Sequence, residues 1–299
     1  MLSRFFIYVF CYPLALLPLC VLYVLSYLLY VMLNYVVRYR RKVIEQNLQN
    51  SFPEKSDKEI RRLRNQYYLH LSFIAIEMVK MLVMSRENLH RRYYCANPEV
   101  VNRFYEQGKS VILMSSHYNN WEWMILSLDE MFKHHGVGVG KPNTDKGFEK
   151  VVNRARTRYG TEVVFADTVR DVFEDYESKH QPCCYMMLSD QSPSNPKKCY
   201  VSDFLNQRSG FIFGAEHFAK KYDIPVIYYQ VVKDRIGCYH FELELITEKP
   251  LETEHGDITE KYIHLLEKTI IEKPNHILKD IQQNEQKEMK YAKKQSRFA

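Results

Sequence analysis

The cysteines of this chain lack the patterns of a metal site or a disulfide framework. Seven occur in 299 residues, and no two are spaced as C-x2-C. The odd number, with Cys11 and Cys20 inside an apolar segment, argues against a disulfide framework. Zinc sites usually need closely spaced thiolates, and the adjacent His134 and His135 lie in a charged stretch typical of solvated side chains. We therefore expect no metal, and reduced thiols as in the cytoplasm.

The chain also lacks the motifs of a nucleic-acid-binding protein. It has 42 basic and 36 acidic residues, a net charge of +6, and four of the basic residues, Arg38, Arg40, Arg41 and Lys42, directly follow an apolar run. No recognition motif accompanies this charge. We expect the basic excess to attract an anionic membrane surface, its head groups or an anionic carrier protein, and we expect no nucleic-acid partner.

Charged residues are absent from residues 5–37. About 20 apolar residues cross a bilayer as a helix. Pro13 and Pro18 should kink or break the first part, which leaves one span over about residues 16–36. A cleaved signal peptide is the alternative, but its apolar region would be only about 7–15 residues long and would end in small residues rather than arginines. The basic cluster after the run predicts a single-pass anchor in the inner (cytoplasmic) membrane, with the remaining chain on the cytoplasmic face.

The rest of the chain alternates strand-like and helix-like segments. This order predicts an α/β fold with a single open mixed sheet flanked by helices. We expect a membrane anchor and basic segment over residues 1–42, one domain over 43–280, and a charged tail over 281–299 that is frayed or disordered. Ser56 and Glu59 form a capping-box pattern that begins a helix to about Met84. The expected strands are 111–114, 136–140, 162–166, 183–188, 225–232 and 239–246. The further helices are expected at 121–132, 145–159, 168–178, 211–222 and 257–272.

The most informative motif is a base and an acid that follow the apolar run 111–114. His117 and Glu122 stand five positions apart in the sequence SSHYNNWEW. Residues at that spacing in one continuous helix are about 140° apart around its axis and do not share a face. His117 and Glu122 can therefore meet only if the chain turns between them.

Such a turn is predicted by the residues between the pair. Asn119 or Asn120 is suited to cap a helix that begins at Trp121, with Glu122 in its first turn. In the functional interpretation, Glu122 accepts a hydrogen bond from one imidazole nitrogen of His117, and the other nitrogen takes a proton from an attacking hydroxyl. In the alternative, His117 is a loop residue bonded to backbone and Glu122 is an ordinary first-turn acid.

Several segments, in order along the chain, together resemble one family. They are Glu45–Leu48 and Ser51–Glu54, His117–Glu122, Lys141–Asn143 and Arg156–Gly160, Asp190-Gln191, and Phe204 with Gly214–Val226. With the N-terminal apolar helix, these blocks resemble the bacterial lipid A biosynthesis (late, or secondary) acyltransferases of the lysophospholipid acyltransferase superfamily. The resemblance spans roughly residues 5–275.

The resemblance implies an acyltransferase that takes its acyl chain from an acyl-carrier protein or acyl-CoA thioester, without a metal or other cofactor. It implies that His117 deprotonates an acceptor hydroxyl and that Glu122 holds His117 in place. The candidate substrate-binding residues are Asn120, Arg156, Arg158, Asp190 and Gln191. For the arginines, phosphate or carrier groups are the expected ligands, and a solvated helix stripe is the alternative. For Asp190, the alternative is a strand-end turn.

The chain departs from the family pattern where substrate recognition is expected. The segment 274–279 lacks the glutamate and tryptophan common in the last block, Ser192-Pro193 follows Asp190-Gln191, and Lys141 stands where an arginine is frequent. The predicted activity is transfer of a fatty acyl chain to a hydroxyl of a lipid A precursor. The alternatives are a lysophospholipid or aminolipid acceptor, or a non-catalytic membrane-anchored binding protein.

Overall fold

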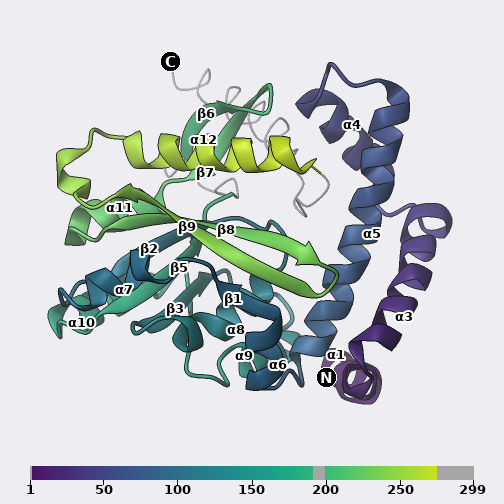
Figure 1. Cartoon of the computed structure of the whole chain (residues 1–299), viewed down its shortest axis with the longest axis horizontal. Coiled ribbons are helices and arrows are strands. Elements are labelled where there is room, and N and C mark those ends of the chain that lie inside the picture. The colour runs from purple at the N-terminus through teal and green to yellow at the C-terminus, as the bar shows by residue number, and fades with distance from the viewer. Residues whose placement is uncertain (1, 191–198, 275–299) are drawn as a thin grey trace.

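A curled, mixed seven-stranded sheet with the strand order β1-β9-β8-β2-β5-β3-β4 forms the centre of the molecule (Figure 1). The structure is a computed structural model and describes residues 2–190 and 199–274. The strands are β1 (Tyr93–Cys95), β2 (Val111–Ser115), β3 (His135–Gly140), β4 (Glu162–Phe165), β5 (Cys183–Leu188), β8 (Val226–Arg235) and β9 (Cys238–Thr247). A separate antiparallel hairpin consists of β6 (Cys199–Phe204) and β7 (Gln207–Ile212). The fold class predicted from the sequence is confirmed.

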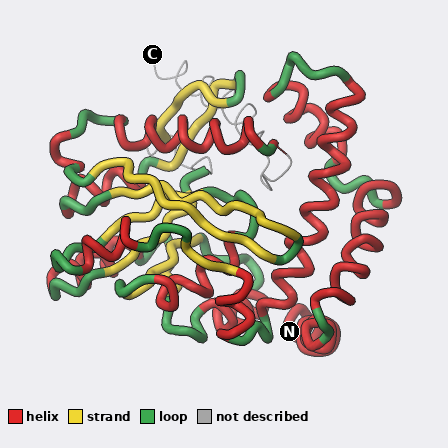
Figure 2. The backbone as a smooth tube through the Cα atoms, in the orientation of Figure 1, coloured by secondary structure: helices red, strands yellow, loops and turns green. Residues whose placement is uncertain are grey.

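Helices cover both faces of the sheet (Figures 1 and 2). They are α4 (Arg41–Ser51), α5 (Asp57–Met81), α6 (Arg86–Arg92), α7 (Glu99–Tyr105), α8 (Trp121–Met131), α9 (Lys146–Arg156), α10 (Val169–Ser178), α11 (Gly214–Tyr222), the 3₁₀ turn η4 (Pro250–Glu252) and α12 (Asp257–Glu272). Alternate residues of a strand point to opposite faces. In β2, Ile112 and Met114 pack into the core between the sheet and α10, α11 and α12. Val111 and Leu113 pack into the core on the other face, between the sheet and α7, α8 and α9.

The six strands predicted from sequence are all present, with bounds shifted by no more than a few residues. The three others escaped prediction: β1 is short, and the β6–β7 hairpin carries polar residues on both faces, with the pair Ser202 and Ser209 on one and the pair Asp203 and Arg208 on the other. The helix expected over residues 211–222 begins only at Gly214, because Phe211 and Ile212 belong to β7. The capping box of α5 is confirmed, with hydrogen bonds in both directions between Ser56 and Glu59. The predicted tail over 281–299 lies outside the described residues.

The N-terminal apolar segment is divided into two helical parts. The first contains α1 (Leu2–Phe6), the π-helical turn η1 (Ile7–Cys11) and α2 (Tyr12–Leu16), and the second contains α3 (Leu19–Val31) and the π-helical turn η2 (Met32–Val36). Between them, Leu17 and Pro18 are extended, with ψ of 149° and 145°. The predicted break therefore falls at Pro18. The Lys80 ammonium donates to the carbonyls of Ala15 and Leu17, at 2.8 and 3.0 Å, and satisfies the backbone that the break exposes.

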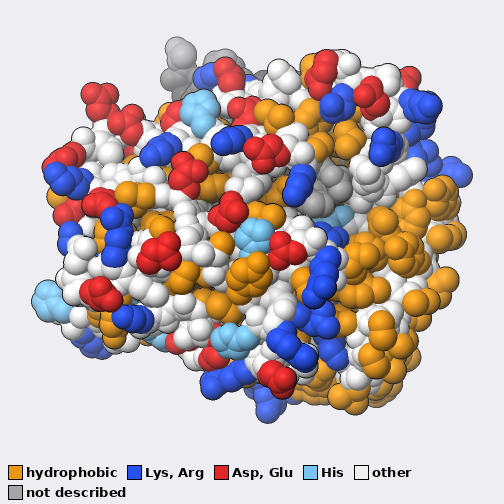
Figure 3. Space-filling model, viewed as in Figure 1, with side chains coloured by type: hydrophobic (Ala, Val, Ile, Leu, Met, Phe, Trp, Pro, Cys, Tyr) orange, Lys and Arg blue, Asp and Glu red, His pale blue; other side chains and the backbone are white. Residues whose placement is uncertain are grey.

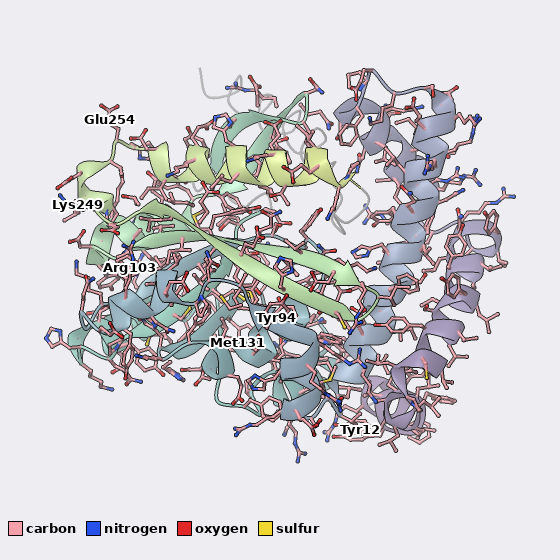
Figure 4. The ribbon with its side chains drawn as sticks, in the orientation of Figure 1. Tyr12, Tyr94, Arg103, Met131, Lys249 and Glu254 are labelled. Atoms are coloured by element: carbon pink, nitrogen blue, oxygen red, sulfur yellow. The ribbon has the colours of Figure 1, made fainter. Side chains whose placement is uncertain are left out.

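Among the described residues, one helix is long and apolar enough to cross a membrane, Leu19–Val36. This helix runs antiparallel to α5. Near one end the Tyr23 hydroxyl donates to Glu77, and near the other the Asn34 amide donates to Asn65. The outer side of the N-terminal helices forms a continuous apolar area, with Lys and Arg side chains along its border (Figure 3). Tyr12 lies in this part of the molecule, whereas Lys249 and Glu254 lie on the opposite side (Figure 4).

Candidate functional site

His117 is held by Asp190 at the carboxyl edge of the sheet. Its Nδ1 lies 2.8 Å from Asp190 Oδ1, and its backbone N–H donates to Asp190 Oδ2 at 3.0 Å. The Asp190 side chain is 5% exposed and that of His117 is 18% exposed. A carboxylate that accepts from Nδ1–H fixes the imidazole tautomer, so that Nε2 carries the lone pair. His117 is thereby held with its Nδ1 edge against Asp190.

The strand register brings these two residues together. β2 and β5 are parallel neighbours, and Ser115 lies opposite Leu188. The ladder continues past the strand ends, because Ser189 N–H donates to the Ser115 carbonyl at 2.9 Å. Two residues beyond Ser115 and Leu188 are His117 and Asp190. The strand order reverses at β2. The next strand along the chain, β3, lies on the β5 side of β2, whereas the later strand β8 lies on its other side. Open α/β sheets bind ligands at such a reversal.

The loop between β2 and α8 is fixed by contacts to two other elements and by one contact to the start of α8. The Tyr118 hydroxyl donates to the Lys273 carbonyl at 3.0 Å, directly after α12. The Asn119 amide donates to the Val231 carbonyl of β8 at 2.7 Å, and its φ of 53° makes the turn that the motif required. The Trp121 ring packs against His117, with 5.0 Å between the ring centroids.

Asn120 caps α8, as one of the two sequence alternatives predicted. Its Oδ1 accepts from the Trp123 N–H at 3.0 Å, and its Nδ2 donates to Glu77 Oε2 at 2.7 Å. The side chain is fully buried. These contacts give Asn120 a role in holding the loop, and its predicted contact with substrate stays a prediction.

Glu122 lies in the first turn of α8, as predicted, and forms a two-pronged ion pair with Arg156 of α9. Arg156 Nε donates to Glu122 Oε2 at 2.8 Å, and Arg156 Nη2 donates to Glu122 Oε1 at 2.5 Å. Burial opposes the charge of Arg156, but the neighbouring carboxylate outweighs it and raises the pKa of the guanidinium above its ordinary value. The acid on His117 Nδ1 is thus Asp190, and the predicted hydrogen bond between Glu122 and His117 stays a prediction.

Arg158 is directed at backbone rather than at the His117 loop. Its guanidinium donates to the carbonyls of Leu82, at 2.9 Å, and Met84, just after the end of α5. It also lies over the Tyr159 ring. Arg158 thereby satisfies backbone carbonyls of the turn that follows α5. Of the other predicted substrate-binding residues, Gln191 lies outside the described residues.

The described residues contain no group of three or more His, Cys, Asp or Glu side chains arranged to hold a metal ion. The adjacent histidines of the sequence have separate partners. His134 is within hydrogen-bond distance of the Lys109 carbonyl at 3.1 Å, and burial lowers its pKa to about 4. His135 lies 3.4 Å from Asp129, at the opposite edge of the sheet from His117.

Together, these features define a class of site: a histidine oriented by a buried acid at the carboxyl edge of an α/β sheet, in a protein that also carries an exposed apolar surface on its N-terminal helices. Comparison with known families identifies the class further. The chain belongs to the bacterial lipid A biosynthesis acyltransferase family, whose profile matches residues 1–278. It is therefore an acyltransferase of the lipid A type. A search of curated proteins found no match.

Proposed function

We propose that this protein transfers a fatty acyl chain from an acyl thioester to a hydroxyl of a lipid A precursor. The observation that carries this proposal is the His117–Asp190 pair, in which a buried carboxylate orients an imidazole, within the residues that the family profile matches. The thioester is carried by an acyl-carrier protein or by coenzyme A. The mechanism needs no cofactor, because the thioester itself supplies the activated acyl group.

The reaction proceeds in two proton-coupled steps. His117 Nε2 takes the proton of the acceptor hydroxyl as its oxygen attacks the thioester carbonyl carbon. The tetrahedral intermediate then collapses, the carbon–sulfur bond breaks, and the imidazolium returns the proton to the leaving thiolate. Asp190 stabilises the imidazolium through Nδ1–H. The products are the acyl ester and the free carrier thiol.

The Glu122–Arg156 pair holds a positive group on the first turn of α8, the helix that follows the His117 loop. The Arg156 side chain is 22% exposed and that of Glu122 is 3% exposed. A guanidinium held by a carboxylate keeps its plane while its remaining N–H groups can bind phosphate. We propose that Arg156 binds a phosphate of the acceptor or of the carrier.

An assay of the purified protein tests this function. Acyl-carrier protein and coenzyme A thioesters are each combined with a lipid A precursor, a lysophospholipid and an aminolipid, and products are identified by mass spectrometry. We expect an added acyl chain on the lipid A precursor, and one acyl chain fewer on lipid A from a deletion strain. Transfer only to a lysophospholipid or aminolipid would establish the alternative acceptor. Absence of transfer to every acceptor would favour a binding protein.

We further propose that the active domain lies at the cytoplasmic face of the inner membrane. A single crossing by α3 is the arrangement that the sequence predicts. The packing of α3 favours a second arrangement, in which its exposed side lies in one leaflet. Its partner helix α5 carries the exposed Arg61 and Arg62 and the buried Glu77, and these would have to accompany α3 across the bilayer.

Protease accessibility distinguishes the two arrangements. With an epitope tag placed before Met1, a single crossing exposes the tag to protease added outside spheroplasts. If α3 stays on α5 as the structure has it, the tag remains protected, and this is the result we expect. A tag at the C-terminus serves as the control, since it is protected in both arrangements. Digestion of the N-terminal tag would establish the crossing and show that α3 separates from α5.

A further inference from the structure

Glu77 is a carboxylate near the C-terminal end of α5 with no exposed surface. Three side chains from three other parts of the chain donate to it. They are the Tyr23 hydroxyl to Oε1 at 2.7 Å, the Tyr239 hydroxyl to Oε2 at 2.8 Å, and the Asn120 amide to Oε2 at 2.7 Å. Burial raises the pKa of Glu77, whereas the tyrosine hydrogen bonds and the nearby Lys233 charge lower it. A buried acid is costly, and here it joins α3, β9 and the His117 loop.

Glu77 determines which way the Asn120 amide points. Because a carboxylate oxygen accepts, the Asn120 amide must present Nδ2 to Glu77, which leaves Oδ1 to cap α8 at the Trp123 N–H. The Trp123 indole N–H also donates to the Glu77 backbone carbonyl at 3.2 Å. Glu77 therefore fixes the start of α8 from two sides. The first turn of α8 carries Glu122, and Trp121 packs on His117.

Tyr23 connects this carboxylate to the apolar surface. It belongs to α3, whose outer side chains Val24, Leu28 and Val31 are exposed. Its ring packs edge-on against Phe73, with 5.5 Å between the ring centroids. Its hydroxyl also touches the turn at Gly237, where φ is +69° and an added Cβ would collide with it. The hydroxyl can thus reach Glu77 only while α3 lies against α5.

We propose that Glu77 is a positioning residue that couples docking of α3 to the geometry of the His117 loop, with Tyr23 as the membrane-side contact. The expected change in kcat rests on the proposed acyl transfer, whereas the structural coupling is measured separately, by tryptophan fluorescence. When α3 shifts, Glu77 loses the Tyr23 donor, the Asn120 cap loosens, and Trp121 and His117 lose their fixed placement. The site is then complete only when the apolar helix is in place.

The Tyr23→Phe variant tests this coupling, with Tyr27→Phe as its matched control. Tyr27 lies one turn further along α3 and packs edge-on against the same Phe73 ring at 5.7 Å, but it makes no hydrogen bond among the described residues. In the full-length protein in vesicles, we expect Tyr23→Phe to lower kcat roughly tenfold with KM for donor and acceptor unchanged, since a small misplacement of a base is costly. Tyr27→Phe should keep both constants.

Tryptophan fluorescence provides the readout that does not need activity. The chain has two tryptophans, Trp121 and Trp123, and both belong to the coupled loop. We expect acrylamide to quench the Tyr23→Phe variant more strongly than the wild type or Tyr27→Phe, at equal thermal midpoint and membrane fraction. Glu77→Gln should show the same increase, and combining it with Tyr23→Phe should add little.

The outcomes separate this proposal from the proposed function. Unchanged quenching and unchanged kcat in Tyr23→Phe would overturn the coupling, whatever the acceptor. If Tyr23→Phe shows increased quenching but the wild-type protein transfers no acyl chain, the coupling stands and the proposed activity is refuted. Tyr23 is a packing residue, and the proposal fails, if two results occur together. Tyr23→Phe lowers the thermal midpoint along with the change in quenching, and Glu77→Gln leaves the quenching unchanged.

Discussion

His117→Ala should abolish acyl transfer while the protein still folds and binds membranes. The variant removes the nitrogen that accepts the hydroxyl proton. The fold should survive because the contacts that Tyr118 and Asn119 make from the same loop to the end of α12 and to β8 remain. We expect kcat to fall by about 10³-fold or more, as is typical when a general base or its partner is removed from a coupled site. The measurement is single-turnover transfer to the preferred acceptor, with thermal unfolding followed in parallel.

Two further variants make this experiment specific. Asp190→Asn keeps the size of the side chain but removes the charge that stabilises the imidazolium, so we expect a loss of the order of 10²–10⁴-fold in kcat with little change in KM. His135→Ala removes a histidine paired with Asp129 at the opposite edge of the same sheet and should leave kcat unchanged. Full activity in His117→Ala would contradict the mechanism, and full activity in Asp190→Asn would return the orienting role to Glu122.

Breaking the Glu122–Arg156 pair should destabilise the fold and reduce activity together. Glu122→Ala leaves the Arg156 charge in a mostly buried position, and Arg156→Ala leaves the buried Glu122 carboxylate alone. Removing one partner of a buried pair costs about 3–5 kcal/mol of folding free energy. Chemical denaturation in detergent solution measures this change, and initial rates under saturating substrate measure the effect on kcat.

The double variant Glu122→Leu/Arg156→Met distinguishes a role of the pair in folding stability from a role in substrate binding. Apolar side chains of similar volume can replace a buried ion pair at little cost, so much of the lost stability should return. We expect activity to stay low because the group proposed to bind phosphate is absent. Recovery of both stability and activity would show that the pair serves only the fold. Single variants as stable as the wild type would show that the ion pair contributes nothing to the free energy of folding.

The strands and the helix caps were readable from the sequence because their signals are local. Short apolar runs bounded by polar turns predicted β2, β5, β8 and β9, and the Ser56 capping box predicted the start of α5. By contrast, β1 gains its order from pairing with β9, far along the chain, and its three residues carry no pattern of their own.

The partners of the site residues were harder to predict because they depend on tertiary packing. Glu122 and His117 are close in sequence, which favoured pairing them, but Arg156 competes for the carboxylate from a different helix. The pairing of Asp190 with His117 could have been predicted from the sequence. His117 and Asp190 each follow a buried strand by two residues, and parallel pairing of those strands sets them side by side. Glu77, an acid far from the two in the first turn of the same helix, gave no signal at all.

The shared register of β2 and β5 limits which changes in chain length this enzyme can accept. A residue inserted within either strand would advance its end by about 3.3 Å relative to the other and reverse the faces of the residues beyond it. His117 and Asp190 would then no longer meet, although every residue of the motif would still be present in the sequence. Between the strands, the turns flanking α9 and α10 can lengthen or shorten without moving either strand end. Length differences among related chains should therefore accumulate in those turns and be absent from residues 111–117 and 184–190.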